Sequence, residues 1–206
     1  MQFNVVEIFN SIQGEGPLLG LPCTFVRLSG CNLDCWYCDT ENKDEINMKL
    51  TPQELINKAL HYKTNHVVIT GGEPMLQKDL IKEFIELLPN DVGVSIETNG
   101  LIRDELVVPD QYVVSPKLKI ISDEKLFEII RWYQDNIEVY DFKFVVGSVQ
   151  EMRTLIKIAN EVICDEIYIQ PRYPFKKGIK FIMNNLNKFY NPIWVQPQAH
   201  KCFGLR

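Results

Sequence analysis

The sequence lacks any apolar run long enough to cross a membrane, and its basic residues are outnumbered by acidic ones. A membrane-spanning helix needs about 18 or more apolar residues, so we expect no contact with a membrane. The opening residues, MQFNVVEIFN, lack the basic start and long apolar centre of a secretory signal, which predicts a cytoplasmic protein with reduced thiols. A net charge of −5 argues against a broad nucleic-acid surface, because binding phosphates needs a basic patch. The composition therefore favours a small-molecule substrate and no direct nucleic-acid partner.

The sequence also has no internal repeat, no linker and no low-complexity segment. Its 206 residues are 46% hydrophobic and 24% charged, which is ordinary for a soluble globular protein. A chain of this length can bury roughly 70% of its unfolded surface in one core. We therefore predict a single domain over residues 1–206.

Cysteine is scarce overall, but three of the six cysteines lie within eight residues, in the loop GCNLDCWYCDT. Cys31, Cys35 and Cys38 have C-x-x-x-C-x-x-C spacing, which is too crowded for each thiol to find a local disulfide partner. Soft thiolates select zinc, copper(I) or iron–sulfur clusters, and a structural zinc site normally needs four protein ligands. A 4Fe–4S cluster on three cysteines would leave one iron open for chemistry. The alternative is a zinc site completed by a distant ligand such as His200 or Cys202.

Strand and helix patterns alternate along the chain. The apolar runs predict strands over Pro22–Leu28, His66–Thr70, Val92–Glu97, Tyr112–Val114, Val139–Val146, Glu166–Gln170 and Ile193–Gln196. Two capping boxes and the apolar periodicity predict helices over about Pro52–Tyr62, Leu76–Leu88, Asp123–Gln134, Ser148–Val162 and Ile179–Leu186. Strands separated by helices pair in parallel through right-handed crossovers. Six or seven strands are too few for a closed barrel, so we predict an α/β fold with an open, partial parallel β/α barrel.

Five polar clusters follow the predicted strands, namely SGCNLDC, TGGEP, ETNG, SPK and QPRY. In an α/β barrel the active site is assembled at the carboxyl ends of the strands. Each cluster alone is explained by turn chemistry. Their recurrence at one end of successive strands predicts a shared site at the mouth of the barrel.

The cysteine spacing, with Tyr37 directly before the third cysteine, resembles the radical S-adenosylmethionine superfamily. That resemblance implies a 4Fe–4S cluster whose open iron chelates S-adenosyl-L-methionine, and an electron from the cluster that releases a 5′-deoxyadenosyl radical. A longer block is similar to the 7-carboxy-7-deazaguanine synthase family, and it reads EIFNSIQGEGPLLGLPCTFVRLSGCNLDCWYCDT. The similarity continues through TGGEP, ETNG, SPK and DFKFVV to the terminal QPQAHKCFGLR, so it covers nearly the whole chain.

The second resemblance implies an activity in 7-deazapurine (queuosine) biosynthesis. Such an enzyme is a carbon–nitrogen lyase that converts 6-carboxy-5,6,7,8-tetrahydropterin to 7-carboxy-7-deazaguanine with loss of ammonia. The adenosyl radical would remove hydrogen from carbon 6, and the ring would then contract. The family resemblance also implies Mg²⁺, an electron donor such as a flavodoxin, and a homodimer. It assigns no acid–base catalytic residue, because the protein positions the substrate and excludes water and oxygen.

The resemblance also implies three sets of site residues. The cluster ligands are Cys31, Cys35 and Cys38, and Thr40 is the ligand of Mg²⁺. The expected substrate contacts are Ile12, Gln13, Gly14, Glu15, Arg27, Thr70, His200 and Arg206, with Glu15 on the donor edge of the pterin and Arg27 on its carboxylate. The expected S-adenosylmethionine contacts are Tyr37, Cys38, Asp39, Gly72, Asn99, Ser115, Pro116, Lys117, Gln170, Pro171, Arg172 and Tyr173.

Two other functions share part of this pattern. An activating enzyme for a glycyl-radical protein has the same cysteine motif, but it would have no use for the SIQGEG block. A zinc-stabilised interaction protein would use the cysteines without chemistry, and it would lack the visible absorption of an iron–sulfur cluster.

Overall fold

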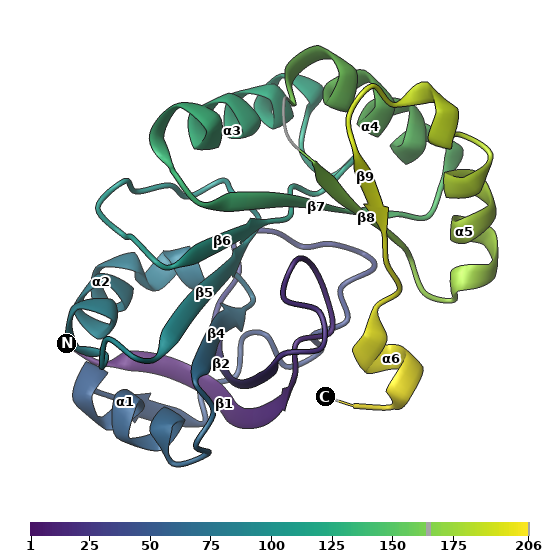
Figure 1. The fold of residues 1–206 in the computed structure, drawn as a ribbon. Helices are drawn as coiled ribbons and strands as arrows, with labels where there is room; N and C mark the ends of the chain where they lie inside the picture. The colour runs from purple at the N-terminus through teal and green to yellow at the C-terminus, as the bar shows by residue number, and fades with distance from the viewer. Residues whose placement is uncertain (164–165, 206) are drawn as a thin grey trace. The chain divides into compact units, whose positions relative to one another are not determined.

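The computed structural model describes residues 1–163 and 166–205, so the predicted substrate contact Arg206 lies outside the described residues. The chain divides into two compact units. The first unit contains Met1–Ile12 and Leu21–Tyr112, and the second contains Gln13–Gly20 and Val113–Arg206. Both units are α/β (Figure 1). The single domain over residues 1–206 stays a prediction.

The first unit is built on a mixed sheet. Its strands are β1 (Phe3–Ile12), β2 (Pro22–Leu28), β3 (Met48–Leu50), β4 (His66–Gly71) and β5 (Gly93–Thr98), paired in the order β3-β1-β2-β4-β5. The pairs of β1 with β2 and β3 are antiparallel, whereas β2, β4 and β5 are parallel. The helices are α1 (Pro52–Leu60), α2 (Lys78–Leu87) and the short 3₁₀ helix η1 (Pro74–Gln77).

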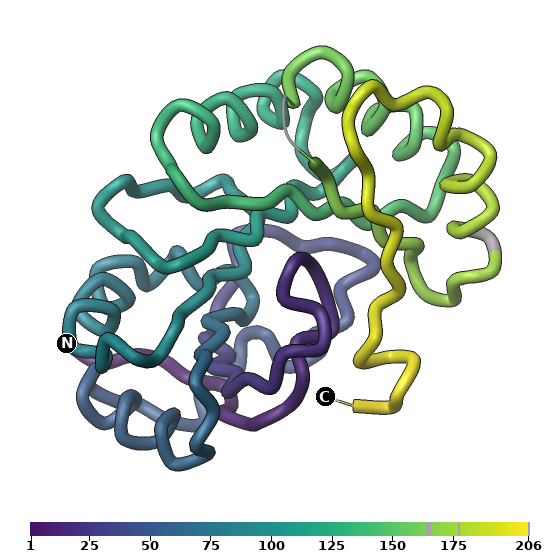
Figure 2. Tube along the Cα trace, in the orientation of Figure 1, coloured from purple at the N-terminus to yellow at the C-terminus, as the bar shows by residue number. Residues whose placement is uncertain are grey.

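The second unit repeats the parallel arrangement. Strand β6 (Gln111–Val114) leads into it, and β7 (Tyr140–Val146), β8 (Ile167–Pro171) and β9 (Ile193–Val195) pair in parallel. The helices are α3 (Asp123–Asn136), α4 (Val149–Val162), α5 (Phe175–Met183), α6 (Ala199–Phe203) and the 3₁₀ helix η2 (Leu186–Lys188). The chain trace shows the C-terminal segment leaving β9 and ending in α6 (Figure 2).

The predicted elements are all present within a few residues, but the predicted strand count of six or seven is wrong. Nine strands occur in the described residues. The sequence pattern missed β1 and β3, and β1 pairs antiparallel with both neighbours. Polar residues interrupt the apolar run of β1, FNVVEIFNSI, so it does not read as a fully buried parallel strand.

The local signals that begin the helices have the expected effect. Thr51 caps α1, where the backbone N–H of Glu54 donates to its hydroxyl and the Glu54 carboxylate accepts from the backbone N–H of Thr51. Ser148 caps α4 by accepting from the backbone N–H of Glu151 at 3.2 Å. The Glu151 carboxylate accepts from the backbone N–H of Gly147 at 2.8 Å. In a standard capping box this carboxylate would accept from the N-cap residue, Ser148, which is one position later. Caps of this kind stabilise a helix by about 1 kcal/mol each.

The parallel strands of the first unit end at the same edge of its sheet. Leu28 at the end of β2 lies opposite Gly71 at the end of β4, and β5 pairs with β4 in parallel. The carboxyl ends of parallel strands meet at one edge, so the cysteine loop, TGGEP and ETNG are brought together there. For SPK and QPRY, which belong to the second unit, the shared mouth stays a prediction.

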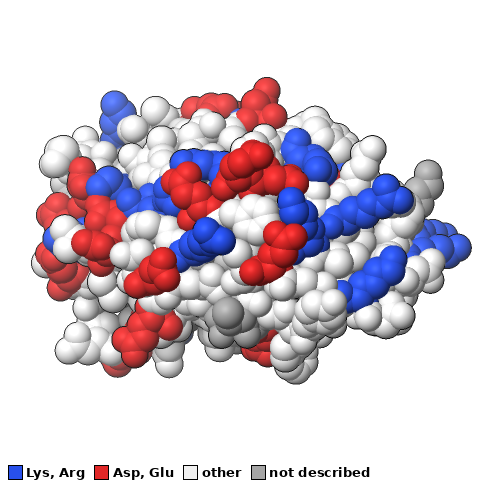
Figure 3. Space-filling view, turned by 90° about the horizontal axis from the view of Figure 1, so that it is seen from above, with Lys and Arg blue, Asp and Glu red and all other residues white. Residues whose placement is uncertain are grey.

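The charged residues are of both signs. On the face drawn in Figure 3, acidic and basic side chains lie among one another, with uncharged surface around them. None of the helices within residues 1–163 and 166–205 has the length and apolar character needed to span a membrane.

Candidate functional site

The cysteine loop begins directly after β2. Cys31 and Cys35 are half-buried, Cys38 is exposed, and none of the three is in a disulfide. Burial raises the pKa of the Cys31 thiol above its ordinary value, and the charge of Glu73 raises it further. Three thiols on one short loop are a suitable donor set for a three-ligand iron–sulfur cluster. Across the described residues, no three His, Cys, Asp or Glu side chains are already arranged around a metal position, so a cluster would have to draw the thiols together.

Main-chain hydrogen bonds join the cysteine loop to TGGEP. The Gly30 carbonyl accepts from the backbone N–H of Glu73 at 2.8 Å, and the Leu28 carbonyl accepts from that of Gly72 at 3.3 Å. A Cβ on Gly72 would lie 2.3 Å from the Gly30 oxygen and 2.8 Å from the Cβ of Cys31. Glycine is therefore needed at position 72 because the two segments touch through their backbones.

We predict that Gly72→Ala lowers the iron content of the reconstituted protein. The added methyl group would overlap with backbone atoms of Gly30, so the cysteine loop must move away from TGGEP. Iron analysis and the visible absorption of the anaerobic protein measure the loss. Gly20→Ala is the control for an added methyl group, because a Cβ there meets no atom within 4 Å, although the φ of +93 strains any residue other than glycine. Full iron content in Gly72→Ala would show that this contact does not support the cluster.

Glu73 connects TGGEP to ETNG. Its carboxylate is fully buried and accepts hydrogen bonds from the Thr98 hydroxyl at 2.7 Å and from the backbone N–H of Asn99 at 2.7 Å. The Asn99 amide in turn donates to Asn32 Oδ1 in the cysteine loop at 2.7 Å. The sequence analysis did not select Glu73, although a carboxylate between two glycines and a proline was a visible signal.

Arg27 and Thr40, which were assigned to substrate and to Mg²⁺ respectively, lie together. Arg27 Nη1 donates to Thr40 Oγ1 at 3.3 Å, and its Nε forms an ion pair with Glu7 at 2.9 Å. The guanidinium also lies 5.8 Å from the centre of the Phe9 ring. Glu7 was missed by the sequence analysis. It lies opposite Arg27 in the antiparallel pair of β1 and β2.

The remaining predicted residues of the first unit lie near these loops in sequence. The Thr70 hydroxyl donates to the Glu97 carboxylate at 3.4 Å. Tyr37 is half-buried, with its ring 5.2 Å from that of Trp36, and Asp39 is exposed. Ile12 is the last residue of β1.

In the second unit, the C-terminal segment holds the segment Gln13–Gly20, which contains three of the predicted substrate contacts. The Gly14 carbonyl accepts from the backbone N–H of Ala199 at 3.0 Å, and the Gly16 carbonyl accepts from Gln196 Nε2 at 3.0 Å. A Cβ on Gly14 would lie 2.8 Å from His200 Nδ1. Four of the predicted substrate residues, Gln13, Gly14, Glu15 and His200, are therefore brought into one group.

Glu15 is the charged centre of this group. Its Oε2 contacts the ammonium of Lys143, its Oε1 accepts from Gln198 Nε2 at 3.0 Å, and His200 Nδ1 lies 3.9 Å from Oε1. Burial by itself would raise the pKa of Glu15. The charge and hydrogen bond of Lys143, with smaller contributions from Gln198 and His200, instead lower this pKa to about 2. Lys143 and Gln198 were not selected from the sequence, although a lysine inside the apolar strand DFKFVV was a usable signal.

The predicted cofactor residues of the second unit fall into two groups. In the first, Ser115 and Pro116 are buried, and Lys117 Nζ donates to Ser115 Oγ at 3.0 Å. In the second, Gln170 is fully buried at the end of β8, and neither its Oε1 nor its Nε2 has a hydrogen-bond partner among the described residues. A buried amide in this state is costly unless a ligand supplies the missing partners.

The three predicted residues after Gln170 differ in burial. Pro171 is the last residue of β8 and is buried. The Arg172 guanidinium donates to Glu151 in α4, and both side chains are largely buried. Tyr173 is 58% exposed, with Lys201 Nζ 5.9 Å from its ring centre.

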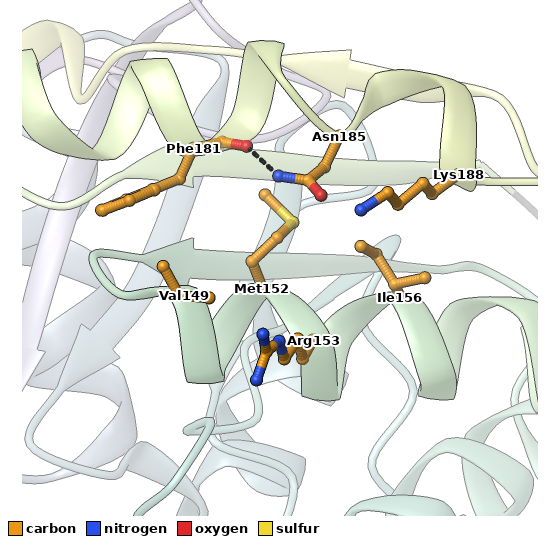
Figure 4. Close-up of a pocket in the computed structure, with 7 residues that line it drawn as sticks. All are labelled: Val149, Met152, Arg153, Ile156, Phe181, Asn185 and Lys188. Carbon is orange, nitrogen blue, oxygen red and sulfur yellow. Dashed lines mark hydrogen bonds between the residues drawn. The ribbon is translucent and has the colours of Figure 1, made fainter.

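A groove of about 270 Å³ lies between α4 and the α5–η2 segment (Figure 4). Its lining is mostly apolar, with two basic side chains, and consists of Val149, Met152, Arg153, Ile156, Phe181, Asn185 and Lys188. None of the predicted site residues lines this groove. The predicted active site therefore does not include this groove.

Comparisons with known proteins agree with the cysteine pattern. Residues 25–176 match the model of the radical SAM superfamily. A 7-carboxy-7-deazaguanine synthase from Methanospirillum hungatei is 37% identical over 98% of this chain and 85% of the relative. One from Aquifex aeolicus is 34% identical over 97% of this chain and 93% of the relative.

Solved structures show the same fold. QueE from Escherichia coli superposes with a TM-score of 0.66 at 22% identity, covering 95% of this chain and 94% of that one. SuiB from Streptococcus suis, solved with S-adenosylmethionine, has a TM-score of 0.57 at 15% identity, covering 81% of this chain and 48% of that one. The superfamily match and the QueE likeness confirm the predicted α/β fold of the open, partial-barrel type.

Proposed function

Since this chain belongs to the 7-carboxy-7-deazaguanine synthase family of the radical S-adenosylmethionine superfamily, we propose that it contracts the ring of 6-carboxy-5,6,7,8-tetrahydropterin, with loss of ammonia, to 7-carboxy-7-deazaguanine. The observation that carries this proposal is the similarity over 98% of the chain, which includes the SIQGEG loop as well as the cysteine loop. In this role the protein is a carbon–nitrogen lyase that serves queuosine biosynthesis. A glycyl-radical activating function and a zinc-stabilised interaction protein are not favoured.

We assign the 4Fe–4S cluster to Cys31, Cys35 and Cys38. When bound, the cluster and S-adenosylmethionine supply the radical chemistry that starts the reaction. Gly72 and Asn99 support this assignment because TGGEP and ETNG are hydrogen-bonded to the cysteine loop. The other residues assigned to S-adenosylmethionine are Tyr37, Asp39, Ser115, Pro116, Lys117, Gln170, Pro171, Arg172 and Tyr173. Among them Gln170 has the strongest support, since its buried amide lacks partners in the described chain.

We assign the pterin to two sets of residues. In the second unit, Glu15 accepts hydrogen bonds from the donor edge of the pterin, and Gln13, Gly14 and His200 shape the loop around it. In the first unit, Arg27 binds the substrate carboxylate, because a guanidinium can grip both oxygens. Ile12, Thr70 and Arg206 complete the proposed set.

We assign Mg²⁺ to Thr40. Its hydroxyl is a hard oxygen donor, and Mg²⁺ retains several waters and needs few protein ligands. The structure has Arg27 Nη1 donating to this same oxygen at 3.3 Å. The positive guanidinium beside this oxygen would oppose a cation there, so a turn of Arg27 toward the substrate carboxylate would favour binding of Mg²⁺. This arrangement would link magnesium binding to the presence of substrate.

The remaining parts of the proposal concern partners. An external reductant such as a flavodoxin is needed, because the reaction starts with one electron delivered to the cluster. We also propose a homodimer, as the family resemblance implies, and a single domain over residues 1–206.

The proposal is tested by reconstituting the protein anaerobically with iron and sulfide. It is then incubated with S-adenosylmethionine, reductant, Mg²⁺ and 6-carboxytetrahydropterin. Mass spectrometry should find a product lighter than the substrate by one ammonia. Iron should be the bound metal, and the protein should absorb near 400 nm, about where iron–sulfur charge transfer occurs. Stoichiometric zinc without iron would overturn the proposal, as would a loaded cluster that cleaves S-adenosylmethionine and leaves the pterin unchanged.

A further inference from the structure

Lys143 is a buried lysine inside strand β7. It is 4% exposed, and its ammonium contacts Oε2 of Glu15, which is 128 positions earlier in the chain. A buried charge is stable only when an opposite charge and hydrogen bonds compensate it. Glu15 is part of this compensation, and its side chain is only 13% exposed.

The carboxylate of Glu15 still has capacity for further donors. Its partners within the described residues are the Lys143 ammonium on Oε2 and the Gln198 amide on Oε1 at 3.0 Å, with His200 Nδ1 at 3.9 Å. An ionised carboxylate offers about four lone-pair positions, so about two remain. The amino-pyrimidinone edge of a pterin presents two neighbouring N–H donors. The remaining capacity of Glu15 therefore matches a ligand of this class.

The charge state of Glu15 decides whether such a ligand can bind. An ionised carboxylate only accepts hydrogen bonds, whereas a protonated one carries an O–H that would oppose an N–H donor. Burial favours the protonated form, and the neighbouring Lys143 charge is what reverses this preference.

We propose that Lys143 is a positioning residue for substrate recognition, which fixes the orientation and the negative charge of Glu15 so that this carboxylate accepts both N–H groups of the pterin edge. This inference rests on the proposed function, because it concerns the same substrate. It goes beyond that function in placing the control of recognition on a residue that acts through Glu15. Among the residues that the structure describes, the charged groups that face Glu15 are Lys143 from β7 and, when protonated, His200 from α6.

The test is the pH dependence of substrate binding, measured by anaerobic calorimetry with 6-carboxytetrahydropterin on the cluster-loaded protein. In Lys143→Met, burial is no longer opposed by the lysine, so the pKa of Glu15 rises above its ordinary value. Above the new pKa the carboxylate is ionised and binds. Below it, the ratio of the variant's Kd to the parent's Kd should grow by about tenfold per pH unit, as expected for one proton.

Matched variants separate this effect from others. Glu15→Gln should remove the pH-dependent part, and adding Lys143→Met to it should change Kd little further, because Lys143 acts through Glu15. The titration should persist when His200→Asn is added to Lys143→Met, which excludes His200 as its source. If Lys143→Met does not fold, Lys143→Gln gives the same test, since its amide can donate without supplying charge.

Two outcomes would overturn the inference. One is a ratio of Kd values that is the same from pH 5.5 to 8.5, which indicates a structural role only. The other is an equal loss of affinity from Lys143→Met in the presence and absence of Glu15→Gln. Failure of the proposed function looks different, because the parent protein itself would then not bind the pterin at any pH.

Discussion

Replacing Cys31, Cys35 or Cys38 by alanine is expected to abolish the conversion of 6-carboxytetrahydropterin. Each thiol would supply one of the three protein bonds to the cluster, and the methyl group of alanine cannot replace a thiolate ligand. Product should fall below detection in all three variants, because the electron that starts the reaction would have to pass through the cluster. Iron content and visible absorption should fall as well. Mass spectrometry of the product and iron analysis measure both effects.

Cys202→Ala is the control for these variants. Cys202 is exposed in α6 and is outside the cysteine motif. We expect this variant to retain its iron and its activity. Loss of metal from Cys202→Ala would instead indicate a four-ligand structural site, and the three-cysteine cluster would then be rejected.

Much of the first unit could be predicted because its signals are local. The strand Pro22–Leu28 is a short apolar run, and Thr51 with Glu54 forms a capping box that needs no distant contact. Strand β1 was missed because its apolar positions are interrupted by polar residues. With β1 unrecognised, the position of Glu7 opposite Arg27 could not be predicted either.

The contacts of the site were harder to predict than its members. The family resemblance identified Glu15 and His200 as substrate contacts. Lys143 is separated from Glu15 by 128 positions in the sequence, and only the folded chain brings the two side chains together. The role of Glu73 could not be predicted from the sequence for the same reason. Its role in holding ETNG depends on two neighbouring strands that end at one edge. A single sequence therefore identifies reactive residue types more readily than the buried charges that orient them.

Arg27→Ala is expected to weaken binding of 6-carboxytetrahydropterin severely while leaving the cluster and S-adenosylmethionine binding nearly intact. Removing one partner of a buried charge pair typically costs about 2–5 kcal/mol. A guanidinium has about five N–H donors, and the hydrogen bonds of Arg27 to Glu7 and Thr40 use two of them. Enough donors remain to grip a carboxylate through both oxygens. Calorimetry with the pterin and with S-adenosylmethionine measures the two affinities separately.

Variants at Arg27 and Glu7 distinguish hydrogen bonding of the guanidinium to both carboxylate oxygens from the effect of its positive charge. Arg27→Lys retains the positive charge but loses the planar fork, so its affinity should lie between those of the parent and Arg27→Ala. Glu7→Gln retains the shape of the side chain that holds Arg27 Nε at 2.9 Å and should weaken substrate binding less than Arg27→Ala does. Unchanged pterin affinity in Arg27→Ala would remove Arg27 from the proposed substrate contacts. Equal affinities for Arg27→Lys and the parent would show that charge alone is sufficient and that the two-oxygen grip is not used.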